Sequence, residues 1–153
     1  MSYKSVLVIS DLHIPYHHED AFDFLKALKK KYKPDLVVNI GDEIDQHNIS
    51  MHDSNPDLPS SGDELRSARV YVKELEKIFP EMTIVHSNHS SLIYRRALKH
   101  GLSVEYLKSY NEFLQVGPGW QWVDDLTITL SDGQKCFFTH GMAARALAVS
   151  MQY

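Results

Sequence analysis

Residues 36–45 read Leu-Val-Val-Asn-Ile-Gly-Asp-Glu-Ile-Asp, and this stretch indicates how the chain folds. Its first half is apolar and lacks the alternation of a half-exposed strand, which is typical of a parallel strand buried on both faces. Gly41 then allows a close approach of the backbone, and the carboxylates of Asp42 and Asp45 follow. Because α/β proteins place their sites at the carboxyl ends of such strands, the stretch predicts a buried strand with acidic side chains at a functional edge.

The same pattern occurs three more times along the chain. The polar motifs are Asp11-Leu12-His13 after the apolar run 6–10, Asn88-His89 after 83–86, and His140-Gly141 after 136–139. Neighbouring strands would gather these carboxylates, imidazoles and the amide around one volume, an arrangement that suits a pair of divalent cations. Each motif alone has an ordinary alternative, a polar turn or a strand-end carboxylate. Their joint occurrence in this order favours the metal hypothesis.

The segments between the motifs predict an α/β domain. Strands over residues 5–10, 36–40 and 83–86, separated by helices over 19–31 and 63–79, form a βαβαβ half with parallel strands. In the first helix, Phe22, Leu25 and Leu28 form an apolar stripe that Phe24 is expected to widen.

A second, hairpin-rich half is expected after helices over 91–100 and 103–114. Strands are predicted over 121–124 and 126–130, followed by an Asp132-Gly133 turn, an antiparallel strand over 135–139 and a helix over 142–150.

Length and composition restrict the class of protein. The 153 residues predict a single domain over 1–153. A net charge of −4 argues against a strongly basic nucleic-acid binder, although bound dications would offset several carboxylates. One cysteine, Cys136, excludes an internal disulfide and fits a reducing cytoplasm. The sequence has no run of about 18 apolar residues, so no membrane span is predicted.

The order and spacing of the motifs resemble the calcineurin-like metallophosphoesterase superfamily from residue 5 to about residue 142. DLH, GDEID, SNHS and THG stand where the family has D-x-H, G-D-x-x-D, G-N-H-[DE] and a later His. The resemblance implies a metallophosphoesterase-type αββα sandwich of two mixed sheets flanked by helices, and a dinuclear metal-dependent hydrolase of phosphoesters. The loops over 11–18 and 45–62 resemble those of small phage or bacterial members, which implies a cytoplasmic protein, in the host cytoplasm if it is phage-encoded.

The resemblance also implies the metal ligands. Asp11 and His13 would bind the first metal, Asp42 would bridge both, and Asn88 and His140 would bind the second. A hydroxide between the metals would attack phosphorus. Mixed nitrogen and oxygen ligands suit two divalent ions, with Mn preferred and Fe, Zn or Mg as alternatives.

Four further residues receive roles around the metals. By resemblance, His89 is the general acid and Asp45 the carboxylate that orients it. Arg95 and His17 could approach a substrate phosphate; the alternatives are a solvated helix face and a solvated loop.

The chain departs from the family pattern at several positions. Ser87 replaces a glycine, which is tolerated unless the turn needs a positive φ, and Ser90 replaces an acidic residue. Gln46 stands where eukaryotic phosphoprotein phosphatases have an arginine. The family's G-H-x-H segment is not found, so we expect a C-terminally incomplete member that binds metal weakly, has low activity and forms homo-oligomers.

Hydrolysis of phosphodiesters is the preferred hypothesis, with DNA or RNA as one candidate substrate. A phosphomonoesterase or protein phosphatase is one alternative, and a non-catalytic scaffold with the same fold is another. Metal content and the hydrolysis of a chromogenic phosphodiester separate these hypotheses.

Overall fold

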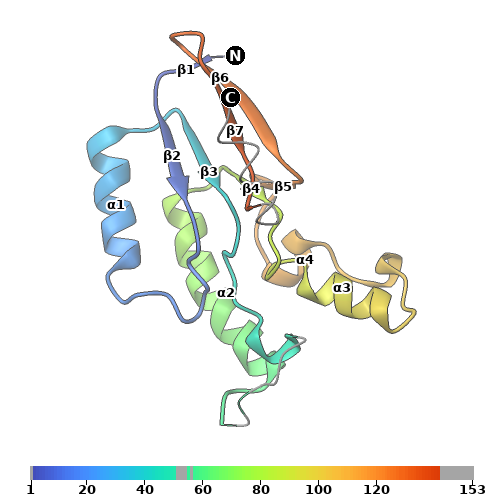
Figure 1. The fold of residues 1–153 in the computed structure, drawn as a ribbon. Coiled ribbons are helices and arrows are strands. Elements are labelled where there is room, and N and C mark those ends of the chain that lie inside the picture. The colour runs from blue at the N-terminus through green and yellow to red at the C-terminus, as the bar shows by residue number, and fades with distance from the viewer. Residues whose placement is uncertain (1, 51–54, 56, 142–153) are drawn as a thin grey trace.

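The strands form two sheets in the computed structural model, which describes residues 2–50, 55 and 57–141 (Figure 1). The first sheet has the order β2-β3-β4-β5, and all of its neighbours are parallel. Its strands are β2 (Val6–Ile9), β3 (Leu36–Asn39), β4 (Met82–Val85) and β5 (Trp120–Val123). The second sheet contains β1 (Ser2–Tyr3), β6 (Leu126–Leu130) and β7 (Lys135–Phe138). There β1 pairs parallel with β6, and β7 pairs antiparallel with β6.

The α/β fold with two sheets and flanking helices is confirmed, but only one of the two sheets is mixed. The described strands of the first sheet are parallel throughout because helical crossovers connect them, and a crossover returns the chain in the same direction. The strand expected over 121–124 therefore belongs beside β4 and not in the hairpin-rich half.

Two long helices cover the parallel sheet, α1 (Ala21–Tyr32) and α2 (Ser61–Ile78). Figure 1 shows them side by side. The Ser60 hydroxyl accepts a hydrogen bond from the Asp63 N–H and caps the start of α2. Phe22 and Leu25 are buried as predicted, but Phe24 is 62% exposed because it lies outside the stripe that faces the sheet.

The segment expected to be one helix over 103–114 is two short pieces after α3 (Leu92–Lys99). They are the 3₁₀ turn η2 (Val104–Tyr106) and α4 (Tyr110–Leu114). Ser109 and Glu112 form a capping box, which starts a new helix at Tyr110. A further 3₁₀ turn, η1 (His47–Ile49), follows β3.

The main core lies between the parallel sheet and its helices. Val72 and Leu75 of α2 and Ile84 of β4 are fully buried there, together with Trp120 of β5. The Trp120 indole N–H donates to the carbonyl of Phe79 (2.8 Å), so burial of this ring leaves no polar atom unpaired. The helix predicted over 142–150 lies outside the described residues. None of the described helices is long and apolar enough to cross a membrane.

Candidate metal centre

The first two candidate loops are joined by the hydrogen-bond ladder of the parallel sheet, which continues past the ends of β2 and β3. The N–H of Asp11 donates to the carbonyl of Gly41 (3.1 Å), and the N–H of His13 donates to the carbonyl of Asp42 (2.8 Å). Backbone pairing therefore places three of the predicted ligands next to one another.

These three residues have an unusual backbone conformation. Their φ angles are 52° at Asp11, 48° at His13 and 53° at Asp42, all in the left-handed region. A non-glycine residue there costs roughly 1 kcal/mol or more, and such strain persists where the surrounding structure enforces it, often at functional sites. Here the ladder between the two loops enforces it.

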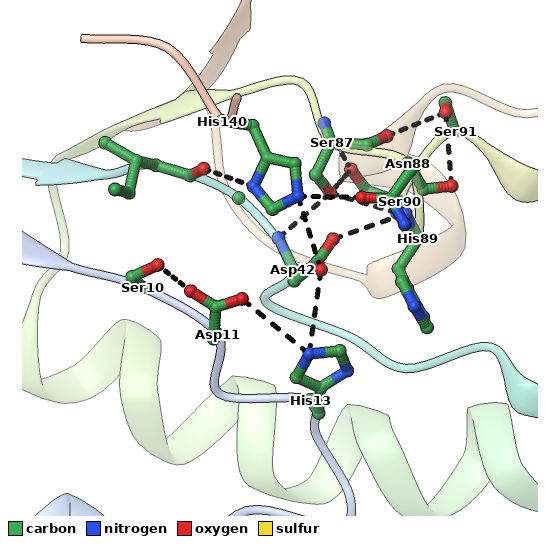
Figure 2. A network of polar contacts seen from close by, with 12 residues as sticks. Ser10, Asp11, His13, Asp42, Ser87, Asn88, His89, Ser90, Ser91 and His140 are labelled. Carbon is green, nitrogen blue, oxygen red and sulfur yellow. Dashed lines mark hydrogen bonds and ion pairs between the residues drawn. The ribbon is translucent and has the colours of Figure 1, made fainter. Parts of the chain in front are cut away.

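Asp42 is buried at the centre of the cluster that Figure 2 shows. Its Oδ2 lies 3.6 Å from His13 Nε2 and 3.3 Å from His140 Nε2. Asp11 Oδ1 lies 3.9 Å from the same nitrogen of His13. Two ligands about 2.1 Å from one cation are ~3.0–3.4 Å apart in octahedral or tetrahedral geometry. The 3.3 Å separation from His140 Nε2 falls in this range and the 3.6 Å separation from His13 Nε2 is slightly longer, so the Asp42 carboxylate could share a cation with either imidazole.

The hydrogen bonds of two histidines determine which ring nitrogen can bind a metal. His13 Nδ1 is 2.7 Å from the Asp45 carboxylate, and His140 Nδ1 is 2.7 Å from the carbonyl of Ile40. An ionised carboxylate and a carbonyl only accept, so Nδ1 donates in both rings. When each ring is neutral, Nε2 carries the lone pair on the side of Asp42, as in metal-binding histidines whose other nitrogen is held by an oxygen.

Asn88 supplies an oxygen on the side of His140. Its Oδ1 is 2.7 Å from His140 Nε2. Because that nitrogen carries a lone pair in the tautomer described above, the two atoms are both acceptors, and a divalent cation can bind both at once. The residues around Asp42 therefore fit divalent metal, with nitrogen and oxygen donors on both the His13 side and the His140 side.

His89 lies on the His13 side of Asp42. One ligand atom from each of His13, Asp42 and His89 lies within 4.8 Å of the other two, so this group could hold a metal. The His89 ring is edge-on to that of His13, with centroids 4.7 Å apart. His89 Nδ1 donates to the backbone carbonyl of Asp45 (2.5 Å), and the Asp45 carboxylate is farther away, at 3.6 Å. Asp45 thus contacts His89 by a hydrogen bond that its backbone carbonyl accepts and, at a longer distance, by its carboxylate.

A pair of serines holds the turn of Asn88 and His89 against Asp42. The Ser87 hydroxyl accepts from the N–H of Asp42 (2.9 Å) and lies 2.7 Å from the Ser90 hydroxyl. Ser87 is outside the group of described residues with positive φ, which is why serine is tolerated here. The two departures from the family motif therefore form one buried bracket, which the sequence interpretation did not predict.

Gly41 makes room for this bracket. A Cβ atom at Gly41, whose φ is 103°, would lie 2.5 Å from Ser87 Cβ and 2.7 Å from His140 Nδ1. Only glycine fits between the second loop and these two side chains.

Glu43 is a further buried acid that the sequence interpretation missed. It is fully buried, and the indole N–H of Trp122 donates to its Oε1 (3.0 Å). Its Oε2 has no hydrogen-bond partner among the described residues. Burial, with a smaller contribution from the charge of Asp42, raises the pKa of Glu43 to about 7. The only signal in the sequence for the pairing of Glu43 with Trp122 is that a buried tryptophan needs a hydrogen-bond acceptor for its indole N–H.

The two residues predicted to contact substrate lie in different surroundings. Arg95 is exposed and donates to the carbonyl of Asn88 (2.5 Å) and to the Ser91 hydroxyl (3.2 Å), so it supports the candidate site from α3. His17 stacks on Phe22, with centroids 4.6 Å apart, and contacts Tyr71 edge-on. Burial lowers the pKa of His17. These contacts hold the His17 ring between Phe22 of α1 and Tyr71 of α2.

Comparison with known families agrees with this geometry. The model of the calcineurin-like phosphoesterase family matches residues 4–150, which is nearly the whole chain. No curated protein sequence matches the chain. The family consists of hydrolases that act on phosphoester bonds, and the described residues include a group of histidine and aspartate side chains that could hold a metal. The chain therefore belongs to the calcineurin-like phosphoesterase family.

Proposed function

We propose that the protein is a dinuclear metal-dependent phosphodiesterase. The observation that carries the proposal is the position of Asp42 Oδ2 between His13 Nε2 and His140 Nε2, at 3.6 and 3.3 Å. In this proposal Asp42 binds both cations. Asp11 and His13 complete the protein ligands of one, and Asn88 and His140 those of the other.

The cations supply the chemistry that side chains cannot. When bound, two divalent ions, with Mn²⁺ preferred over Fe, Zn or Mg, generate a nucleophile from water near neutral pH and offset the charge of the phosphoryl oxygens. The protein's own contribution is to hold the ligands in place. Asp45 fixes the tautomer of His13, the Ile40 carbonyl fixes that of His140, and Ser87 holds the backbone of Asp42.

His89 is proposed to protonate the leaving oxygen. With Nδ1–H donated to the Asp45 carbonyl, Nε2 is the nitrogen left to exchange a proton with substrate or solvent. The side chain is 28% exposed, so a substrate can approach it. General acid catalysis of this kind contributes roughly 10²- to 10⁴-fold to the rate.

The preference for diesters rests on Gln46. Its amide donates to the carbonyl of Ser90 (3.3 Å), where related protein phosphatases have an arginine. A phosphomonoester carries a second negative charge, for which a guanidinium is a good partner. A neutral amide at this place favours the singly charged diester.

Hydrolysis of two chromogenic substrates in Mn²⁺, with metal content measured by elemental analysis, tests the proposal. Bis(p-nitrophenyl) phosphate should be cleaved faster than p-nitrophenyl phosphate, with two metals bound per chain. Asp42→Asn should abolish both metal binding and turnover. Glu81→Gln, an exposed carboxylate just before β4 at the opposite end of the sheet, should change neither. Two metals bound with no hydrolysis of either substrate would instead indicate a non-catalytic scaffold.

A further inference from the structure

An open groove of about 1040 Å³ lies between α1 and α2 and is strongly basic. Six of its nine lining residues are lysines, namely Lys26, Lys29, Lys30, Lys33, Lys73 and Lys77. Glu74 is the single acid in the lining, so the formal charge is +5 in a chain whose net charge is −4. The lysines of this protein are thus concentrated where the two helices face each other.

The spacing of these residues makes the groove linear. Lys26, Lys29 and Lys30 follow the i, i+3, i+4 repeat of one helix face, and Lys33 directly follows the end of α1. Lys73 and Lys77 are four apart on the facing helix. At 1.5 Å per residue, the row on α1 is roughly 10 Å long. The helix macrodipole stabilises cations in the last turn of a helix. That effect does not explain why two helices direct lysines into one groove.

Acidic neighbours neutralise only part of this charge. Lys26 Nζ lies 3.1 Å from Asp23 and 3.0 Å from Glu74, and Lys73 Nζ lies 2.6 Å from Glu76. These two lysines are paired and contribute little to the field of the groove.

The other four lysines of the groove are not paired with a carboxylate of the described residues. Lys29 donates to the carbonyl of Ile78, which is neutral. Within the described part of the chain, Lys30, Lys33 and Lys77 have no carboxylate at ion-pair distance, and all three are exposed. Four uncompensated ammonium groups therefore line one short channel, which raises the local concentration of anions.

We propose that this lysine groove binds the phosphodiester backbone of a nucleic acid. A strand carries one charge per 3.4 Å of helix axis, so a row roughly 10 Å long faces about three phosphates. Lysine contacts phosphates as a point charge and without sequence preference. No aromatic ring is among the described residues that line the groove, so binding runs through phosphates and not through stacked bases. Val70 is the one exposed large apolar residue among the described residues that line the groove, and Phe24 is not among them, whereas a membrane-surface helix presents several such residues beside its lysines.

The groove and the metal centre lie at opposite ends of the helix layer. The candidate ligands follow the carboxyl ends of the strands, where α1 and α2 begin, whereas the lysines lie towards the ends of both helices. From Ala21 to Lys33 the chain rises about 18 Å, so only a polymer could contact both places. That the bound nucleic acid is also the substrate rests on the proposed function. That the groove binds nucleic acid does not.

Fluorescence anisotropy with a labelled 20-nucleotide single-stranded DNA tests the binding. The measurements are made in EDTA, so that no hydrolysis occurs, between 50 and 200 mM NaCl. Four free lysines predict a slope of about −3 for log K against log salt, at roughly 0.7 per phosphate. Absence of binding at 50 mM NaCl would overturn the proposal.

Two matched charge reversals locate the binding surface. Lys30→Glu with Lys77→Glu should weaken binding more than tenfold and reduce the slope by about 1.4, whereas Lys4→Glu with Lys135→Glu changes the net charge equally and should change affinity less than twofold. Lys30→Arg with Lys77→Arg should retain binding, and circular dichroism confirms that all variants fold. Equal losses in both reversed pairs would show a net-charge effect and refute the groove.

Two further measurements distinguish nucleic-acid binding by the groove from the activity of the metal centre and from binding to a membrane surface. Hydrolysis of bis(p-nitrophenyl) phosphate should be unchanged in Lys30→Glu with Lys77→Glu, so the groove and the metal centre can fail independently. Vesicles with 30% phosphatidylserine should bind more weakly than the oligonucleotide. Tighter binding to the vesicles, with the same dependence on Lys30 and Lys77, would assign the groove to a membrane surface instead.

Discussion

Replacement of Glu43 by glutamine should remove a pH-dependent cost in stability. The folded protein holds the pKa of this buried carboxyl at about 7, against an ordinary value of 4.5, mainly through burial. Below pH 4.5 the group is protonated in both the folded and the unfolded chain, and the full stability is present. As pH rises from 4.5 to 7 the unfolded chain loses the proton first, and stability falls. Above pH 7 the loss is complete, at about 3 kcal/mol for a shift of this size.

Urea unfolding followed by circular dichroism at pH 5 and pH 8, in EDTA, measures this effect. The free energy of unfolding of the wild type should fall by about 2–3 kcal/mol more between these pH values than that of Glu43→Gln. Glutamine can still accept from Trp122, but its amide N–H groups would occupy the unpaired side, at a cost of about 1–3 kcal/mol that is independent of pH. The comparison between the two pH values removes this cost. Glu81→Gln is the exposed control, and an equal pH dependence in wild type and Glu43→Gln would refute the reasoning.

Three further outcomes are expected from single changes at the candidate site. Asp42→Ala should abolish binding of both metals in calorimetric titration, whereas Asp11→Ala should weaken mainly one site; two metals bound to Asp42→Ala with normal affinity would contradict the bridging role. His89→Asn should keep both metals but lose about 10²- to 10⁴-fold in rate with poor leaving groups and far less with p-nitrophenolate; equal losses with both would exclude an acid role. Gly41→Ala should destabilise the fold by about 1–3 kcal/mol through overpacking and the positive φ of this position. Ser87→Gly removes the clashing Cβ but also the hydrogen bond to Asp42, so the double variant should lose less stability in thermal unfolding than the sum of the two single changes; additivity would show that they do not touch.

The βαβαβ half could be predicted because its signals are local. A continuous apolar run gives a buried strand and a 3.6-residue period gives a helix, so the strand expected over 36–40 is observed as Leu36–Asn39. The partner of β5 could not be predicted, because its Trp120–Val123 pairing with Met82–Val85 joins segments almost forty residues apart. Phe24 shows a similar limit: an extra apolar residue on a helix does not reveal how wide the covered face is.

The candidate site could be predicted as a set of residues but not as a set of contacts. Ligand-type side chains at strand ends converge because parallel strands end at one edge, and the structure places His13, Asp42 and His140 within hydrogen-bonding or ion-pair range. Which atoms meet depends on side-chain positions that spacing does not encode. The burial of Glu43 and the bracket of Ser87 also arise from residues distant in sequence.

Asp45 shows how one residue can serve two parts of such a site with different atoms. Its carboxylate accepts the Nδ1–H of His13, and its backbone carbonyl accepts the Nδ1–H of His89. An ionised carboxylate increases the electron density that an imidazole offers to a cation, which suits a ligand. A neutral carbonyl fixes the tautomer without adding a charge, which suits a group that must exchange a proton. The second aspartate of the G-D-x-x-D motif therefore acts on His13 through its side chain and on His89 mainly through its backbone, with its carboxylate farther from the His89 ring at 3.6 Å. A substitution of the side chain should consequently disturb His13 more than His89.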